Sequence, residues 1–320
     1  MFFEYALDPS AIENWPTLRY ISENFGPSRG RLLSKFPSNW GQEAFAHITA
    51  SPRDKLRVVE KLKDIERNLL RTKRIYSQDA SWISNVLSAH SIDPFHAMIA
   101  KIDCDHPCFL HIDELDQSNP LWKVDLDGSI KRIASEIARV SLPLLSISSE
   151  VVFVDQHYSS TAKHGKPLSV LIAAARNGKK LSRLEYHLNA HDNAAAFQSG
   201  LEKQLKYIDL KNGEEITFIR WQCIDEVENL HPRYILTNRG GMRFDFGLDE
   251  GKGTSDYGRL GEDLWRKRLE QFKPDSKAFN FVDAWRARMV TVIPARNNNW
   301  EHSAPSVTQV KWSFTKWEEI

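Results

Sequence analysis

The chain has 320 residues, of which 41% are hydrophobic and 27% are charged, a composition typical of a globular protein with one large or two ordinary domains. Its 43 basic and 42 acidic residues nearly cancel. Net charge therefore gives no argument for a nucleic-acid partner, and any nucleic-acid-binding surface must be local. Ten Trp and sixteen Phe favour a well-packed interior over disorder.

The cysteines are few and odd in number, Cys104, Cys108 and Cys223, which argues against an oxidised, secreted scaffold. The first residues, Met-Phe-Phe-Glu-Tyr, lack the basic lead and apolar core of a signal peptide. No stretch approaches the length needed to cross a bilayer. We expect a cytoplasmic protein with no membrane partner. Neither a dinucleotide fingerprint nor a Gly-x-Ser-x-Gly elbow occurs, and no cofactor is expected.

Three regions are predicted: a mainly helical region over residues 1–125, an α/β domain over 126–293 and a tail over 294–320 that packs on the body. In the first region Ser10 precedes a helix-like run over 11–25 and is its expected cap, with Gly26-Pro27 as its end.

The run over 52–70 is also predicted to be helical, because apolar residues recur at Leu56, Val59, Leu62, Ile65 and Leu69. It opens the most basic segment of the chain. One interpretation is a solvated face with weak neighbour ion pairs. The other is a phosphate-backbone contact surface. In the second case the candidate substrate-binding residues are Arg53, Lys55, Arg57, Lys61, Arg71, Lys73 and Arg74.

A cluster of possible metal ligands follows, Cys104, His106, Cys108 and His111. Two thiols and two imidazoles suit zinc. Their spacing matches no common zinc knuckle, however, and four ligands within eight residues form a cramped chelate. We expect a structural loop that enters a strand, with no metal.

The second region alternates helix and strand signals, which predicts a mixed or parallel sheet covered by helices on both faces. Sites in such sheets gather at the carboxyl ends of strands, where Asp155, His157, Glu185 and His187 are expected. The predicted elements are a helix over 128–138, a strand over 149–155, a helix over 166–176, a strand over 181–188, a helix over 192–207, a strand over 216–221 and an amphipathic helix over 260–272.

The stretch from Glu228 to Gly251 carries the clearest motif. An apolar run, Tyr234-Ile235-Leu236, and an alternating run over 242–248 flank Gly240-Gly241, which predicts a β-hairpin. Residues two apart in an extended segment point to the same face. His231 and Arg233 would therefore project together, an arrangement suited to phosphoryl chemistry. Further along, Gly251 to Ser255 is interpreted as a flexible linker, and residues 307–314 as an edge strand.

This stretch resembles the HKD motif of the phospholipase D-like superfamily, in which a His, a Lys two residues on and an acidic residue five further along share one site. Here the matching positions are His231, Arg233 and Asn238, with Gly247 near the glycine of the family. Arg replaces Lys and Asn replaces Asp. The resemblance extends over about half of the chain, from the strand before Asp155 onward.

The resemblance implies a mixed sheet sandwiched by helices and a metal-independent reaction through a phosphohistidine. His231 would act as nucleophile or acid, Arg233 as a bidentate phosphate clamp and Asn238 as the residue that orients His231. Separately from the resemblance, Glu250 is placed to hold a catalytic His or Arg233, and Asp245 and Asp249 are equally available for this role. The alternative is that these loop acids form simple ion pairs.

The chain has no complete second motif. His164 and Lys166 have the His-x-Lys spacing but lack the acid and enter a helix-like run, so we interpret the match as coincidence. Single-motif members of the family dimerise so that each subunit lends one His, which implies a homodimer. The alternative is that His157 or His187 supplies the second role within one chain.

The expected function is that of a phosphodiesterase, a nuclease acting on DNA or RNA. By analogy with stand-alone members of the family, it would serve prokaryotic defence, with a possible partner protein of such a system. The alternative is an inactive module that binds nucleic acid or scaffolds a partner protein. A third possibility is hydrolysis of a lipid or other small phosphodiester.

Overall fold

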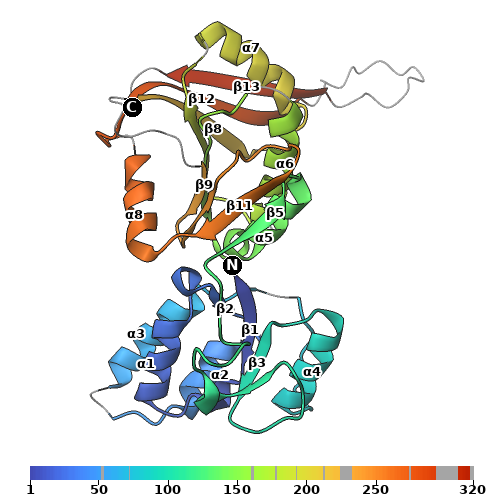
Figure 1. Ribbon diagram of the computed structural model, residues 1–320, viewed down its shortest axis with the longest axis vertical. Coiled ribbons are helices and arrows are strands. Elements are labelled where there is room, and N and C mark those ends of the chain that lie inside the picture. Colours follow the sequence, from blue (N-terminus) through green and yellow to red (C-terminus); the bar gives the residue numbers. More distant parts are fainter. Residues whose placement is uncertain are drawn as a thin grey trace, which may run out of the picture.

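The computed structural model describes residues 1–51, 54–71, 73–159, 162–176, 179–191, 193–211, 213–223, 233–273, 275–292 and 309–317. They form two lobes stacked along the long axis of the molecule (Figure 1). The lower lobe contains the elements up to residue 114, and the upper lobe those from residue 127 onward. Among these residues no helix has the length and apolar character that a membrane crossing requires.

The N-terminal lobe is built on a four-stranded sheet in which every pair of neighbours is parallel, in the order β2-β1-β3-β4. Four α-helices and three short 3₁₀ helices accompany it. The bounds are β1 (Phe3–Leu7), η1 (Pro9–Ala11), α1 (Trp15–Asn24), η2 (Pro27–Arg29), β2 (Arg31–Leu33), α2 (Trp40–His47), α3 (Lys55–Glu66), α4 (Trp82–Ile92), β3 (Ala97–Ala100), β4 (Phe109–His111) and η3 (Ile112–Glu114).

Helices cover both faces of this sheet. Tyr5 and Ile99 point to the face that packs against α1, α2 and α3, whereas Ala6 and Met98 point to the face that packs against α4. This alternation follows from the two-residue period of a strand. The expectation of a mainly helical region was therefore wrong in one respect, because it missed a parallel sheet made of strands only three to five residues long.

Two helices of this lobe differ from their predicted form. α1 begins at Trp15, because Asn14 accepts the amide of Thr17 at 2.9 Å and so caps the helix in place of Ser10. In α3 the buried stripe includes Val58, whereas Leu56 is 68% exposed. The predicted stripe is therefore confirmed at Leu62, Ile65 and Leu69, and only its first member is exposed.

The C-terminal lobe is built on a nine-stranded mixed sheet in the order β13-β12-β8-β7-β6-β9-β10-β11-β5. Strands β6, β7 and β8 are parallel, and the neighbours on either side of this group pair antiparallel. The bounds are β5 (Asp127–Lys131), α5 (Ala134–Ile147), β6 (Glu150–Val154), α6 (Ala162–Arg176), β7 (Arg183–Asn189), α7 (Ala194–Leu205), β8 (Glu215–Cys223), β9 (Arg233–Thr237), β10 (Gly241–Phe244), β11 (Thr254–Arg259), α8 (Glu262–Gln271), β12 (Phe279–Val292) and β13 (Gln309–Trp317).

The central strand β6 is buried on both faces. Val151 and Phe153 pack with α5, α6 and α7, and Val152 and Val154 pack with α8. Figure 1 shows α8 alone on its side of the sheet, facing α5 and α6 across it. The chain is therefore an α/β protein with helices on both faces of a mixed sheet, as expected.

The predicted hairpin is confirmed, since β9 and β10 pair antiparallel with Leu236 opposite Gly241. Its turn lies two residues earlier than the predicted Gly240-Gly241, because the amide of Thr237 donates to the carbonyl of Gly240 and leaves Asn238 and Arg239 at the tip. The predicted edge strand near residues 307–314 is β13.

Two segments were predicted wrongly. The expected helix over 128–138 is divided between β5 and α5, and the expected linker after Gly251 enters β11 at Thr254. Both errors concern the two outermost strands at one edge of the sheet, β11 and β5, which pair with each other.

A buried ion pair links two strands in the other half of the sheet. Arg220 on β8 lies directly across from Asp283 on β12, next to a bulge, and its Nε donates to Asp283 Oδ1 at 2.6 Å. Both side chains are almost completely buried. Removal of one partner leaves an uncompensated charge in the core.

We predict that Asp283→Ala lowers the free energy of unfolding by about 3–5 kcal/mol. The control is Glu262→Ala, which removes an exposed partner of Arg266 and should cost less than about 1 kcal/mol. Denaturant unfolding of the two variants measures the difference. Equal losses would contradict a larger contribution of the buried pair to stability.

Candidate functional site

Arg233, the predicted phosphate clamp, opens β9 at the carboxyl end of the neighbouring strand β6. Its Nη1 donates to the carbonyl of Asp245 at 2.9 Å, and its Nε lies 3.8 Å from Asp155 Oδ1. The side chain is 13% exposed. The predicted nucleophile, His231, lies outside the described residues, so its orientation relative to Arg233 is a prediction.

Asp155 is the centre of the polar groups at this strand end. It is fully buried, and its carboxylate accepts the amides of His157 at 3.0 Å and Leu248 at 2.8 Å. A side chain at Gly247 would place its Cβ 2.9 Å from Asp155 Oδ2 and 2.6 Å from Asp249 Oδ1. Glycine is therefore required there by the close approach of two carboxylates.

Asp249 joins the same group and is held by two cations. Arg132 Nη2 lies 2.6 Å and Lys163 Nζ 2.8 Å from its carboxylate oxygens. Burial opposes the charged form, but the hydrogen bonds from Lys163 and Arg132 outweigh it and lower the pKa of Asp249. The carboxylate is thus ionised at neutral pH.

His164 was dismissed at the sequence level, yet it lies beside these acids. It is 2% exposed, its Nδ1 lies 3.1 Å from the hydroxyl of Ser159, and its Nε2 has no hydrogen-bond partner among the described residues. Burial lowers its pKa, against the opposing effect of Asp155 and Asp249. His157 lies exposed at the rim of the group.

Two other predicted site residues have different neighbours. The carboxylate of Glu250 accepts the amide of Ala134 at 3.3 Å, at the first turn of α5. Asn238 lies at the far end of β9 from Arg233, where its side-chain oxygen accepts the amides of Ser149 and Glu150. Because the whole strand separates Asn238 from Arg233, the two do not share a site, and this corrects the expectation drawn from their spacing.

His187, the other possible second histidine, has a structural role. Trp221 Nε1 can only donate, and it lies 2.8 Å from His187 Nδ1. The imidazole proton is therefore on Nε2, which lies 2.9 Å from Glu185. His187 is fully buried between these partners, which leaves neither ring nitrogen for a substrate.

The predicted basic residues are divided by the structure. Arg53 lies outside the described residues. Lys55 and Arg57 are exposed on α3, and Lys61 is half-buried. Arg74 is inconsistent with substrate binding, because its side chain is 4% exposed and pairs with Glu4 and Asp93.

Arg71 and Lys73 line a cleft of about 880 Å³ between the two lobes. Eight lysines and arginines of the described chain line this interlobe cleft, against a single carboxylate, Glu66. The cations are Lys35, Lys63, Arg67, Arg71 and Lys73 from the N-terminal lobe, and Lys179, Lys180 and Arg239 from the C-terminal lobe. Ser146 and Ser149 also line the wall of the second lobe. The hydroxyl of Ser148 does not face the cleft, because it is buried and bonded to Leu144 and Thr237.

The cations of the interlobe cleft repel one another. Burial, together with the charges of Arg71 and Arg239, lowers the pKa of Lys179 to about 8. Burial and the charge of Arg67 lower the pKa of Arg239 as well. Lys179 is held in place by the carbonyls of Leu145 and Ser146, at 2.8 and 2.7 Å. Like charges fixed close together form a site that favours an anion.

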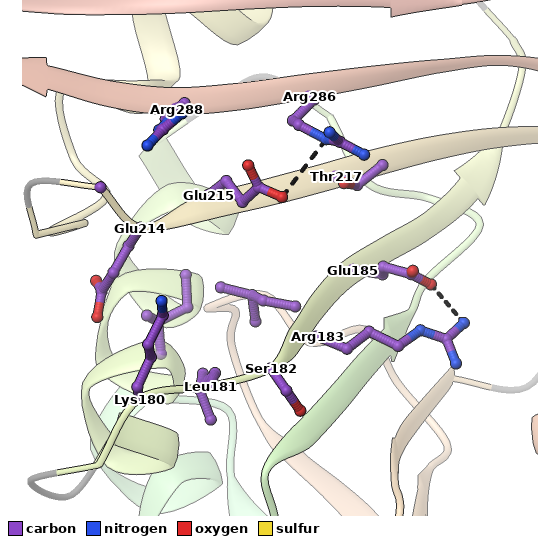
Figure 2. A pocket seen from close by; sticks show the side chains of 13 residues that line it. Lys180, Leu181, Ser182, Arg183, Glu185, Glu214, Glu215, Thr217, Arg286 and Arg288 are labelled. Carbon is purple, nitrogen blue, oxygen red and sulfur yellow. Dashed lines mark hydrogen bonds and ion pairs between the residues drawn. The ribbon is translucent and has the colours of Figure 1, made fainter.

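A second cavity, of about 720 Å³, adjoins the cleft and shares Lys180 with it. Figure 2 shows that its charges of opposite sign face one another. Arg286 lies 3.6 Å from Glu215, and Arg183 lies 2.7 Å from Glu185. Because its cations are largely balanced by its own carboxylates, this cavity is less suited to an anion than the interlobe cleft.

Comparison with known proteins gives no relative, since no protein-family model, curated protein or solved structure matches this chain.

The lowered pKa of Lys179 predicts a pH-dependent stability. The unfolded lysine holds its proton up to the ordinary pKa of 10.5, whereas the folded one releases it near pH 8. Between these values the unfolded state binds more protons, so the free energy of unfolding rises with pH.

We predict that Lys179→Gln removes this rise. Because Lys179 is only half-buried, solvent screening reduces the full effect, and the difference in unfolding free energy between wild type and variant should change by roughly 1–2 kcal/mol across this pH range. Denaturant unfolding at pH 7.5, 9 and 10.5 measures how the free energy of unfolding of each protein changes with pH. The same pH dependence in wild type and variant would contradict the prediction.

Proposed function

We propose that the protein binds nucleic acid across the interlobe cleft. The observation that carries the proposal is the set of eight cations facing a single carboxylate in one cleft. A nucleic acid supplies the matching partner, because its phosphates repeat along a strand and can meet cations on both lobes at once. A small phosphodiester would engage only part of such a surface.

The chemistry of the lining suggests contact with the backbone of the nucleic acid. Arg67, Arg71 and Arg239 carry planar guanidinium groups that bind phosphate bidentately, and the lysines act as point charges. No aromatic side chain is among the described lining residues, so stacking on bases is not expected there. Binding through phosphates alone is independent of sequence and weakens as salt rises.

Two lysines on one helix provide a matched test. Lys63 lines the interlobe cleft, whereas Lys55 is exposed on the same helix, α3, and does not line it. Lys63→Gln should weaken binding to single- or double-stranded DNA or RNA about three- to tenfold. It should also reduce the slope of the logarithm of the binding constant against the logarithm of the salt concentration by about 1. Lys55→Gln should bind like wild type. Fluorescence anisotropy over a salt series measures both, and equal losses would place the interface elsewhere.

Phosphodiester cleavage at the end of β9 is the second candidate function. It is favoured by the gathering of Arg233, His157 and His164 around Asp155, on a hairpin that resembles the phospholipase D-like motif. In this proposal His231 attacks phosphorus or protonates the leaving oxygen, and Arg233 stabilises the charge on the phosphoryl oxygens.

Such a mechanism needs a second histidine. His187 is engaged by Trp221 and Glu185, and His164 is only 2% exposed. The remaining sources are the exposed His157 or His231 of a second copy. A homodimer therefore belongs to this proposal, and sedimentation equilibrium tests it. The interlobe cleft lies at the opposite end of β9, beside Arg239, so binding and cleavage are separable.

We predict that wild type cleaves nucleic acid in excess chelator and that His231→Ala abolishes cleavage while leaving affinity unchanged. Arg233→Lys should lower the cleavage rate by roughly a hundredfold or more, because the bidentate contact with phosphate is lost. Single-turnover assays with labelled oligonucleotides measure the rates. Cleavage that survives in His231→Ala would rule out this mechanism, and binding without cleavage in wild type would favour a binding module.

A further inference from the structure

The loop between β3 and β4 brings two potential metal ligands to the last turn of α4. His106 and Cys108 lie on the loop, and His90 lies on the helix. One ligand atom from each of the three side chains lies within 4.8 Å of the others. The two imidazole rings meet edge to face with their centroids 5.0 Å apart. All three residues are half-buried.

The backbone around these side chains is well anchored. The carbonyl of Cys108 accepts the amide of Met98 on β3 at 2.8 Å. A tight turn surrounds His106. Its amide donates to the carbonyl of Cys104, and its carbonyl accepts the amide of Phe109. The cluster therefore joins a helix end to a strand of the sheet on fixed backbone.

We propose that His90, His106 and Cys108 bind one zinc ion, with solvent in the fourth position. Two imidazoles and one thiolate are ligands that zinc prefers, and three protein ligands with an open fourth position form a recognised zinc geometry. Cys108 is a free thiol. Asp103 and Asp105 on the same loop add negative charge. Arg74 is close to His90, but its charge is balanced by Glu4 and Asp93.

Zinc binding requires small rearrangements. Bonds of about 2.0–2.3 Å bring neighbouring ligand atoms to roughly 3.5 Å of each other, so the side chains must close inward. The Nδ1 atoms of His90 and His106 accept the amides of Phe95 and Cys108, each at 3.2 Å. If Nδ1 binds the metal, its lone pair is no longer free to accept an amide. If Nε2 binds the metal, Nδ1 carries the proton and becomes a donor. Both of these long contacts must then be released.

The bound ion would clamp α4 to the β3–β4 loop. This position is in the N-terminal lobe, and none of the three ligands lines the interlobe cleft. The proposal is therefore independent of nucleic-acid binding.

The test uses the full chain, stripped of metal with a chelator under reducing conditions. Titration with Zn²⁺ followed by calorimetry should give one ion per chain and a raised melting temperature. Substitution with Co²⁺ should give the absorption of a tetrahedral site together with a thiolate-to-cobalt charge-transfer band. Cys108→Ser should abolish that band, and His90→Asn and His106→Asn should each weaken zinc binding by on the order of a hundredfold.

Cys104→Ser and His111→Asn are the controls, because neither residue belongs to the cluster, and both should retain wild-type affinity. Circular dichroism establishes that each variant is folded. Absence of stoichiometric zinc binding, or retention of the charge-transfer band in Cys108→Ser, would overturn the proposal. A loss of zinc affinity in Cys104→Ser equal to that in Cys108→Ser would also overturn the three-ligand site.

Discussion

The antiparallel pairing of β9 with β6 determines where both candidate sites lie. Val152 faces Leu236 and Val154 faces Tyr234 across this pair, and both faces of β6 are buried under helices. A shift of register by one residue would exchange the two buried faces of β9, so that Ile235 would face α8 and Tyr234 and Leu236 the opposite helices, where they do not fit the existing packing. Burial therefore fixes Arg233 beside Asp155 at one end and Arg239 in the interlobe cleft at the other.

The two ends of this strand differ in how their charges are balanced. At the Asp155 end, the carboxylates of Asp155 and Asp249 meet Arg132, Lys163 and Arg233, so that opposite charges compensate locally. In the interlobe cleft the cations face mostly other cations. Such an arrangement costs folding free energy, and an anionic ligand would recover it. The cleft is for this reason the stronger candidate for binding.

The sequence was most informative where a pattern is local. Strand β6 and α8 each show a clear run or period, and their predicted positions agree with the structure within two residues. The β9–β10 hairpin was also predicted, although its turn lies at Asn238 and Arg239. The parallel sheet of the first lobe was missed because its short strands have too few residues to show a period. The order of residues along the chain also gave no indication of the sites. Lys179 and Arg239 meet Arg71 in the interlobe cleft, and His90 meets His106, through tertiary folding that no local motif records.

The joint between the lobes has two unlike sides. Phe2, Leu32 and Leu70 of the first lobe belong to the apolar core of the second, while the interlobe cleft presents cations from both lobes. Contact among the apolar side chains holds the lobes together, and repulsion across the cleft acts to part them. Dissolved ions weaken the repulsion and leave the apolar contact largely unaffected. Of the two opposing contributions at this joint, only the repulsion between the cations is therefore expected to respond to ionic strength.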